Sequence, residues 1–145
     1  MFFVGVNTLG EVEIHGLDEF KDAIAEVRKK YPDRAEAELR KLSNMLKKKA
    51  IQRTPSSKEE HKHKLKKSYH LSQTKQAGTT LYVEFWNSSP HFHLIERGHR
   101  IVDKNGKVHG FQPGVHMVEK STEELNNEMP EELQKWLDEV YKELM

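Results

Sequence analysis

Residues 90–121 read PHFHLIERGHRIVDKNGKVHGFQPGVHMVEKS, and this stretch places a short helix, a hairpin and the start of a long helix one after another. The segment His91–Arg97 is long enough for about two helical turns, and Gly98 is a typical residue to end them. The pair Asn105-Gly106, with apolar β-branched residues on both sides, is a strong local signal for a β-hairpin. The turn residues Pro113-Gly114 then lead into a new helical pattern. Because helices and antiparallel strands share one short stretch, the sequence predicts an α+β fold.

The closing helix is predicted from apolar residues that recur every three or four positions. Val118, Leu125 and Met129 form its first part. Pro130 is expected in the first turn of a continuation, where the N–H that proline lacks is not needed. The apolar line of the continuation consists of Leu133, Trp136, Leu137, Val140 and Leu144.

The N-terminal half shows the same two kinds of pattern. Phe2–Val6 and Glu11–His15 alternate in period two around turn residues, so we expect a small hairpin. A helical pattern over residues 17–31 follows, and Pro32 interrupts it. A second helix is expected over residues 33–53, with lysines near its C-terminal end, where cations suit the helix dipole. Its apolar line consists of Ala35, Leu39, Leu42, Leu46 and Ala50.

The middle of the chain predicts a loop and two strands. Residues 56–67 read SSKEEHKHKLKK, and side chains this polar cannot offset the entropy of ordering, so we expect a mobile loop over residues 55–67. Strands are predicted over residues 68–74 and 80–87, joined by the turn Gln76-Ala77-Gly78. The whole pattern predicts one domain over residues 1–145, in which a small antiparallel β-sheet packs with long N-terminal and C-terminal α-helices.

Composition excludes several classes of function. The 24 basic and 23 acidic side chains nearly cancel, so no overall field draws the protein to nucleic acid or to anionic lipid. The chain has no cysteine, which removes disulfides, thiolate metal sites and cysteine nucleophiles. We also expect no leader peptide and no membrane span, because no basic start with a long apolar run is present. The serines lie in no nucleophile-elbow context, which argues against serine hydrolysis.

A histidine-rich window over residues 91–116 carries the alternative interpretation, a metal-dependent hydrolase or nuclease. Imidazole and carboxylate groups are suitable ligands for zinc. However, His91 and His93 are two positions apart and point to different faces of a helix, unlike the one-turn spacing of metallohydrolase helices. A site across the predicted hairpin, built from His99 and His109, is left open by the sequence. Exposed or interfacial histidines are the favoured interpretation, and we expect no catalytic residue, metal or cofactor.

A third interpretation is a nucleic-acid binding module that uses the lysines between Lys47 and Lys67. Several phosphates would be neutralised by such a run. Glu59 and Glu60 dilute its charge, and no aromatic residue is interleaved to stack on bases. A solvated loop is therefore the favoured interpretation of this segment.

Four short patterns follow one another along the chain. Ile14–Phe20 reads IHGLDEF, Lys47–Ser57 reads KKKAIQRTPSS, Pro90–Arg100 reads PHFHLIERGHR, and Gly110–Ser121 reads GFQPGVHMVEKS. In this order and spacing the chain resembles the small neck and tail-completion proteins of long-tailed bacteriophages and prophages. The resemblance extends over nearly the whole chain.

The resemblance implies a non-enzymatic subunit of the virion that acts in head–tail joining or tail completion. Such proteins act through protein–protein contacts in a ring around the virion axis, so the implied partners are further copies and neighbouring neck, connector and tail proteins. A ring that encloses double-stranded DNA would let it pass without reading it, and near-zero net charge is compatible with passage. The implied location is the neck or tail of the virion, after synthesis in the cytoplasm of the bacterial host.

The residues expected to dock on partners lie in two of these patterns. Glu96 and Arg97 would supply charged specificity, Phe92 and Phe111 buried anchors, and Gly98 a backbone bend. The competing interpretation places the two phenylalanines in the core of the subunit itself and makes Gly98 a simple helix stop. The full expected set is Phe92, Leu94, Ile95, Glu96, Arg97, Gly98, Phe111, Gln112 and Pro113.

Overall fold

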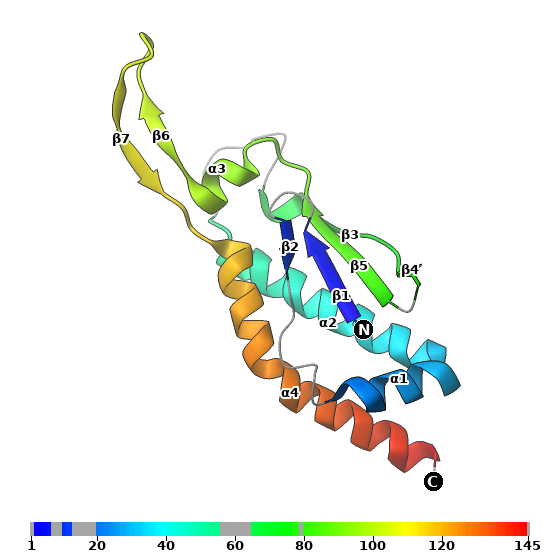
Figure 1. Cartoon of the computed structure of the whole chain (residues 1–145). Coiled ribbons are helices and arrows are strands. Elements are labelled where there is room, and N and C mark those ends of the chain that lie inside the picture. The colour runs from blue at the N-terminus through cyan, green and yellow to red at the C-terminus, as the bar shows by residue number, and fades with distance from the viewer. Residues whose placement is uncertain (1, 7–9, 13–19, 56–64, 79, 145) are drawn as a thin grey trace.

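The computed structural model describes residues 2–6, 10–12, 20–55, 65–78 and 80–144. A layer of helices packs against one sheet, and a two-stranded arm extends away from both (Figure 1). The predicted α+β class is therefore confirmed. Within the described residues, no helix is both long enough and apolar enough to cross a bilayer.

Three helices form the helical layer: α1 (Lys21–Lys30), α2 (Pro32–Arg53) and α4 (Met117–Leu144). Pro32 is the first residue of α2, a position where its fixed φ is compatible with a helix and its missing N–H is not needed. The helix α2 lies behind the sheet, and α4 runs along α2 (Figure 1). The predicted apolar line of α2 is confirmed as core. The core of the helical layer includes Ala35, Leu39, Leu42, Leu46, Ala50, Leu125, Met129, Leu133, Trp136, Leu137 and Val140.

The sheet has the strand order β2-β1-β5-β3, with β4 also paired to β5. Its strands are β1 (Phe2–Val6), β2 (Gly10–Val12), β3 (Tyr69–Leu71), β4 (Lys75–Ala77) and β5 (Thr80–Asn87). The N-terminal hairpin predicted from the sequence is present as β1 and β2, and residues 13–15 of its expected second strand lie outside the described residues. The pairing of β1 with β5 is parallel, whereas the other pairs are antiparallel. Local alternation predicts strands but carries no information on this long-range pairing, which therefore appears only in the structure.

The single strand predicted over residues 68–74 is divided into β3 and β4. Leu71 and Lys75 are four positions apart, but they pair with residues of β5 that are three positions apart, so one extra residue bulges out. Ser72 stabilises the irregularity, because its Oγ accepts the N–H of Glu84 at 2.8 Å and its own N–H donates to the Glu84 carbonyl at 2.8 Å. In the predicted turn Gln76-Ala77-Gly78, the first two residues belong to β4. Gly78 follows the strand and adopts a φ of +59°.

Two further expectations differ from the structure or lie outside it. The helix α4 is continuous from Met117 to Leu144 and contains Pro130, so no second helix begins there. A proline inside a helix removes one backbone bond and bends the helix, and Figure 1 shows that α4 changes direction part of the way along. The expected mobile loop falls mainly on residues 56–64, and the expected start of the first helix on residues 17–19, which lie outside the described residues. The last residues of the expected loop are described, and Leu65–Lys67 forms a short 3-10 helix instead.

Candidate functional site

The arm, residues 98–113, is the part of the described chain that packs least on the rest. β6 (Gly98–Val102) and β7 (Val108–Pro113) pair antiparallel with each other, and none of the other described strands joins them. Figure 1 shows the arm pointing away from the sheet and the helices. Every residue of β7 is exposed. A two-stranded ribbon is at best marginally stable on its own, so the arm presents a long surface without a core behind it.

The tip of the arm is a tight turn organised by Asp103. Its Oδ1 accepts the N–H groups of Asn105 at 2.8 Å and Lys107 at 2.9 Å, and Gly106 adopts the positive φ of +83° that the turn requires. The other carboxylate oxygen lies 2.7 Å from Nε2 of His109. The hydrogen bond from His109, followed by the bonds from the backbone, lowers the pKa of Asp103. The Asn105-Gly106 hairpin predicted from the sequence is thus confirmed.

One face of the arm combines apolar side chains with a cation. The pairs Arg100 with Phe111 and Val102 with Val108 are direct cross-strand partners, and such partners point to the same face. Phe111 is 60% exposed, and the two valines are 53% and 52% exposed. We call these four residues the arm face. Exposed apolar side chains that adjoin one another mark an interaction site more often than a solvated surface.

Two glycines fix the root of the arm, by which we mean residues 92–97 together with Gly98 and Gly114. Gly98 has φ of +93°, and a Cβ there would lie 2.5 Å from the Gln112 carbonyl oxygen and 2.7 Å from the Phe111 ring. A Cβ on Gly114 would meet the Glu96 carbonyl oxygen and would lie 2.5 Å from the carbonyl carbon of Arg97. Because backbones approach this closely on both sides, the arm leaves the body in one direction set by main-chain packing.

Glu96 connects the root to the long helix. It belongs to the short helix α3 (Phe92–Arg97), is 1% exposed, and its carboxylate accepts the N–H of Val118 at 3.1 and 3.2 Å and of Glu119 at 3.2 Å. These N–H groups belong to the first turn of α4 and have no partner within their own helix. A carboxylate at a helix N-terminus also interacts favourably with the helix dipole. Glu96 therefore acts as a cap supplied by another element.

Phe92 anchors the other end of α3 in the core. It is 1% exposed and packs edge-on against Tyr69 with ring centroids 5.8 Å apart. Tyr69 also stacks on Phe85 of β5, and its hydroxyl lies 2.9 Å from the hydroxyl of Thr54. Burial raises the pKa of Tyr69 to about 12, so it remains a neutral packing residue. The sheet, the end of α2 and the root of the arm thus share one buried aromatic cluster.

The structure divides the expected docking residues into three groups, which are enclosed, half-buried and exposed. Phe92 and Glu96 are buried within the subunit, and Gly98 is enclosed by backbone, so these three hold the arm in place. Leu94 and Ile95 are half-buried in α3. The members exposed to solvent are Arg97, Phe111, Gln112 and Pro113.

The metal site that the sequence left open across the hairpin is not formed. His99 pairs with Gln112, whereas His109 lies at the register shift near the tip and bonds Asp103. In the parts of the chain that the structure describes, no group of three or more histidine, aspartate or glutamate side chains is arranged to hold a metal ion. The hydrolase interpretation therefore lacks its metal centre in this window.

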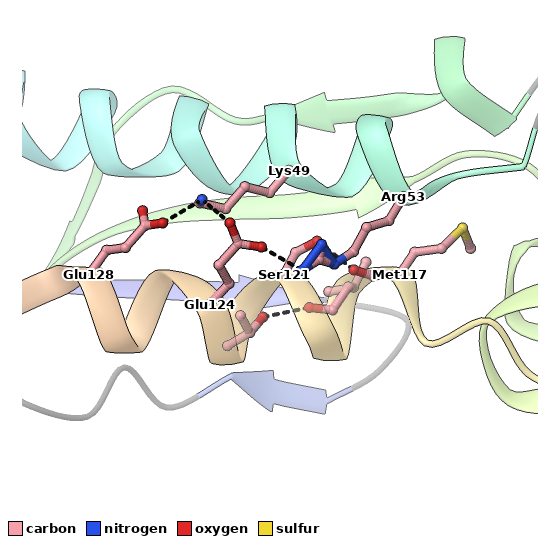
Figure 2. Close-up of polar contacts among 8 residues, drawn as sticks. Lys49, Arg53, Met117, Ser121, Glu124 and Glu128 are labelled. Carbon is pink, nitrogen blue, oxygen red and sulfur yellow. Dashed lines mark hydrogen bonds and ion pairs between the residues drawn. The ribbon is translucent and has the colours of Figure 1, made fainter.

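Two cations at the end of α2, Lys49 and Arg53, form ion pairs with α4. Nζ of Lys49 lies 2.7 Å from Oε1 of Glu124 and 3.0 Å from Oε1 of Glu128, and Arg53 also pairs with Glu124 (Figure 2). The Lys49 side chain is 15% exposed. Because their charges are neutralised inside the subunit, Lys49 and Arg53 are poor candidates for binding phosphates. Residues 56–64 of the same run lie outside the described residues.

The role of Glu96 was missed by sequence reasoning. A cap is normally sought within the four residues before a helix, whereas Glu96 is 22 positions from the N–H of Val118. Gly114 was noted only as a turn residue, and its close approach to α3 is a tertiary contact. The one available local signal was the absence of an Asp, Asn, Ser or Thr immediately before Met117, which indicates that the helix is capped from elsewhere.

Comparison with known protein families gives one match. Residues 18–98, just over half of the chain, match the family described as "HK97-gp10_like: Bacteriophage HK97-gp10, putative tail-component". The matched part contains α1, α2, the strands β3 to β5 and α3, and it ends at Gly98, where the arm begins. No curated protein and no solved structure matches the chain.

Proposed function

Since the chain belongs to the HK97-gp10-like family of bacteriophage tail components, we propose that it is a structural subunit that acts in head–tail joining or tail completion. Its contacts are protein–protein contacts in a ring around the virion axis, made with neighbouring neck, connector and tail proteins. It needs no cofactor and performs no catalysis. It resides in the neck or tail of the virion, after synthesis in the host cytoplasm.

The arm face is the observation that carries this proposal. Its apolar side chains extend from a closely packed root, and each of them is more than half exposed. An interface residue contributes binding energy when it is buried against a partner, and a large apolar ring is the usual centre of such an interface. Phe111, with Arg97, Gln112 and Pro113 around it, forms the docking surface, while Phe92, Glu96 and Gly98 position it. Leu94 and Ile95, which are half-buried, lie between Phe92 and Glu96 in the chain.

The near-zero net charge is consistent with a position close to DNA without tight binding. The formal net charge of the chain is +1, and tight DNA binding requires many unpaired cations. Double-stranded DNA that passes through the ring is thus near the protein without being recognised by it.

The experiment that tests this function is electron microscopy of lysates from the phage or prophage with an early stop codon in this gene. DNA-filled heads beside separate tails, or tails with abnormal ends, are the expected result. Supplying the intact gene from a plasmid restores complete particles and serves as the control. Complete, infectious particles without the protein would overturn the proposed function.

A further inference from the structure

Charge is distributed very unevenly between the arm and α4. The arm contains three cations, Arg100, Lys104 and Lys107, and one carboxylate, Asp103, which gives a net charge of +2. The helix α4 contains nine carboxylates and three lysines, which gives a net charge of −6. The whole chain, by contrast, is close to neutral. The arm is therefore basic, and α4 has an excess of carboxylates, some of which are neutralised by cations of α2.

The cations of the arm have no ion-pair partner within the described chain. Arg100, Lys104 and Lys107 are exposed, and none of them takes part in a salt bridge with another described residue. Asp103, the carboxylate nearest in sequence, is engaged by the backbone of the turn and by His109. The positive charge of the arm is thus free to attract an acidic surface.

The outer face of α4 offers such a surface. Glu119, Glu123, Asn127 and Glu131 follow one another at steps of four, so they lie in one row along the helix. Glu119, Glu123 and Asn127 are exposed, as is Glu131, and the exposed Pro130 adds an apolar position beside this row. The carboxylates on the inner side of α4 are already paired with Lys41, Lys49 and Arg53 of α2. On the outer side, Glu119 lies 2.8 Å from Nδ1 of His116 and Glu131 lies 3.2 Å from Nζ of Lys135, and exposed pairs of this kind are weak enough to be exchanged for another cation. We call the exposed row the acidic row.

The arm cannot reach the acidic row of its own chain. Both begin at the same root, and Figure 1 shows the arm and α4 leaving that root in different directions. A second copy has no such restriction. We propose that the arm of one copy lies along the acidic row of a second copy, so that copies associate head to tail. This inference rests on the proposed function, because it supplies the contact that builds the ring.

A head-to-tail contact has a consequence for assembly. The two surfaces that meet are different, so each copy keeps one free arm and one free acidic row, and addition continues until a rotation closes a ring. The arm face adds apolar burial by Phe111 and Val108 to the charge attraction. Exposed ion pairs are screened by salt, so the contact weakens as ionic strength rises.

Charge reversal tests the contact directly. In the Arg100→Glu/Lys107→Glu variant, attraction to the acidic row becomes repulsion, and self-association measured by sedimentation velocity is expected to weaken by at least about tenfold. Adding Glu123→Lys and Glu131→Lys to the same chain restores the association. The matched control, Lys29→Glu/Lys48→Glu, makes the same change in net charge at exposed positions away from the arm and associates like the wild type.

The absence of native cysteine allows the orientation of the contact to be tested separately. A chain with Lys107→Cys and Glu123→Cys is expected to form a ladder of disulfide-linked multimers on oxidation, whereas either single variant gives no ladder. Efficient dimers of the Lys107→Cys variant alone would show that arms pair with arms and would overturn the proposal. A wild-type protein that stays monomeric at all accessible concentrations would also overturn it.

Phage complementation separates this inference from the proposed function. If the charge-reversed arm still self-associates normally but produces no infectious phage, the arm docks on a different virion protein, and the head-to-tail contact is wrong while the proposed function stands. If both association and infectivity are normal, neither the contact nor the use of the arm as a docking element is correct. Loss of both, with recovery of both in the charge-swapped chain, is the result that the inference predicts.

Discussion

The arm and its root are adjacent in sequence but have opposite environments. In the root, Phe92 and Glu96 are each 1% exposed and bind the sheet and α4 to one another. In the arm, Phe111 is exposed and covers only part of Gly98. Burial of an apolar side chain stabilises the folded state, whereas an exposed one contributes free energy only when a partner covers it. We therefore propose that folding and docking depend on different residues of the same short segment.

The largest effect that tests this comparison is expected at the two phenylalanines. Phe92→Ala removes a buried ring that contacts Tyr69 and lowers the free energy of unfolding by about 3–5 kcal/mol. Phe111→Ala removes a ring of similar size and changes the same free energy by less than about 0.5 kcal/mol. Urea denaturation followed by circular dichroism measures both values. Equal losses at the two positions would show that the arm is part of the folding core and would break the comparison.

The next largest change in the free energy of unfolding is expected for variants of Glu96. Glu96→Ala leaves the N–H groups at the start of α4 without an acceptor in a buried position, and we expect a loss of about 3 kcal/mol. Glu96→Gln keeps one acceptor oxygen and removes the charge, so its loss is smaller. Denaturant titration measures whether Glu96→Ala loses more stability than Glu96→Gln, with the exposed Glu119→Gln as control. A loss in Glu119→Gln as large as that in Glu96→Ala would contradict capping by Glu96.

A buried carboxylate of α2 gives a further test of how the core residues, in contrast to the arm, determine the stability of the fold. Glu38 is 4% exposed, its Oε1 has no hydrogen-bond partner among the described residues, and burial raises its pKa from 4.5 to about 6. Lys41 opposes the increase, and Glu132 and Glu139 add to it. Above pH 6 the folded state therefore holds an ionised carboxylate that is more stable in the unfolded chain.

Removing this charge is expected to stabilise the protein in a pH-dependent way. At pH 8, Glu38→Gln raises the free energy of unfolding by about 2 kcal/mol. The gain in the free energy of unfolding decreases as pH falls through 6 and disappears below 4.5, where wild-type Glu38 is protonated in both the folded and the unfolded state. Thermal unfolding at several pH values measures it, with the exposed Glu36→Gln as control. A constant difference between pH 4 and pH 8 would show that Glu38 does not titrate as described.

The smallest effect is expected at the contact between α2 and α4. Lys49→Met keeps the aliphatic stem and removes the charge that meets Glu124 and Glu128, which lowers stability by up to about 1 kcal/mol at low salt. The loss decreases with added NaCl, because salt screens the pairs. Lys30→Met, which breaks the fully exposed pair with Glu26, serves as the reference and changes stability less. Equal, salt-independent losses in both variants would mean that the contact with α4 is not electrostatic.

Local patterns were sufficient for most elements. The period-two alternation before and after Asn7–Gly10, the apolar line of α2, the stop at Gly98 and the Asn105-Gly106 turn all depend on residues close together in sequence, and each prediction is confirmed. The parallel pairing of β1 with β5 joins residues about 80 positions apart, and no local signal specifies it. The continuity of α4 through Pro130 depends on packing against α2.

The docking residues were predicted as one set because composition does not distinguish an anchor in the core from one on the surface. Phe92 and Phe111 are the same residue type, Phe92 between two histidines and Phe111 between Gly110 and Gln112, and neither pair of neighbours indicates burial or exposure. What separates them is that Phe92 of α3 packs on Tyr69, whereas β7 pairs with β6 and with no other described strand. The family resemblance pointed to the segment, and the structure separates its residues into buried and exposed members.

The most direct test of the separation between folding and docking is one variant measured in two ways. Val108→Ser/Phe111→Ser removes two apolar side chains of the arm face and leaves the root intact. The melting temperature is expected to stay within about 2 °C of the wild type, while the variant gene fails to restore plaques to a phage that lacks the protein. Plaques at wild-type numbers, from a protein with wild-type stability, would contradict the account.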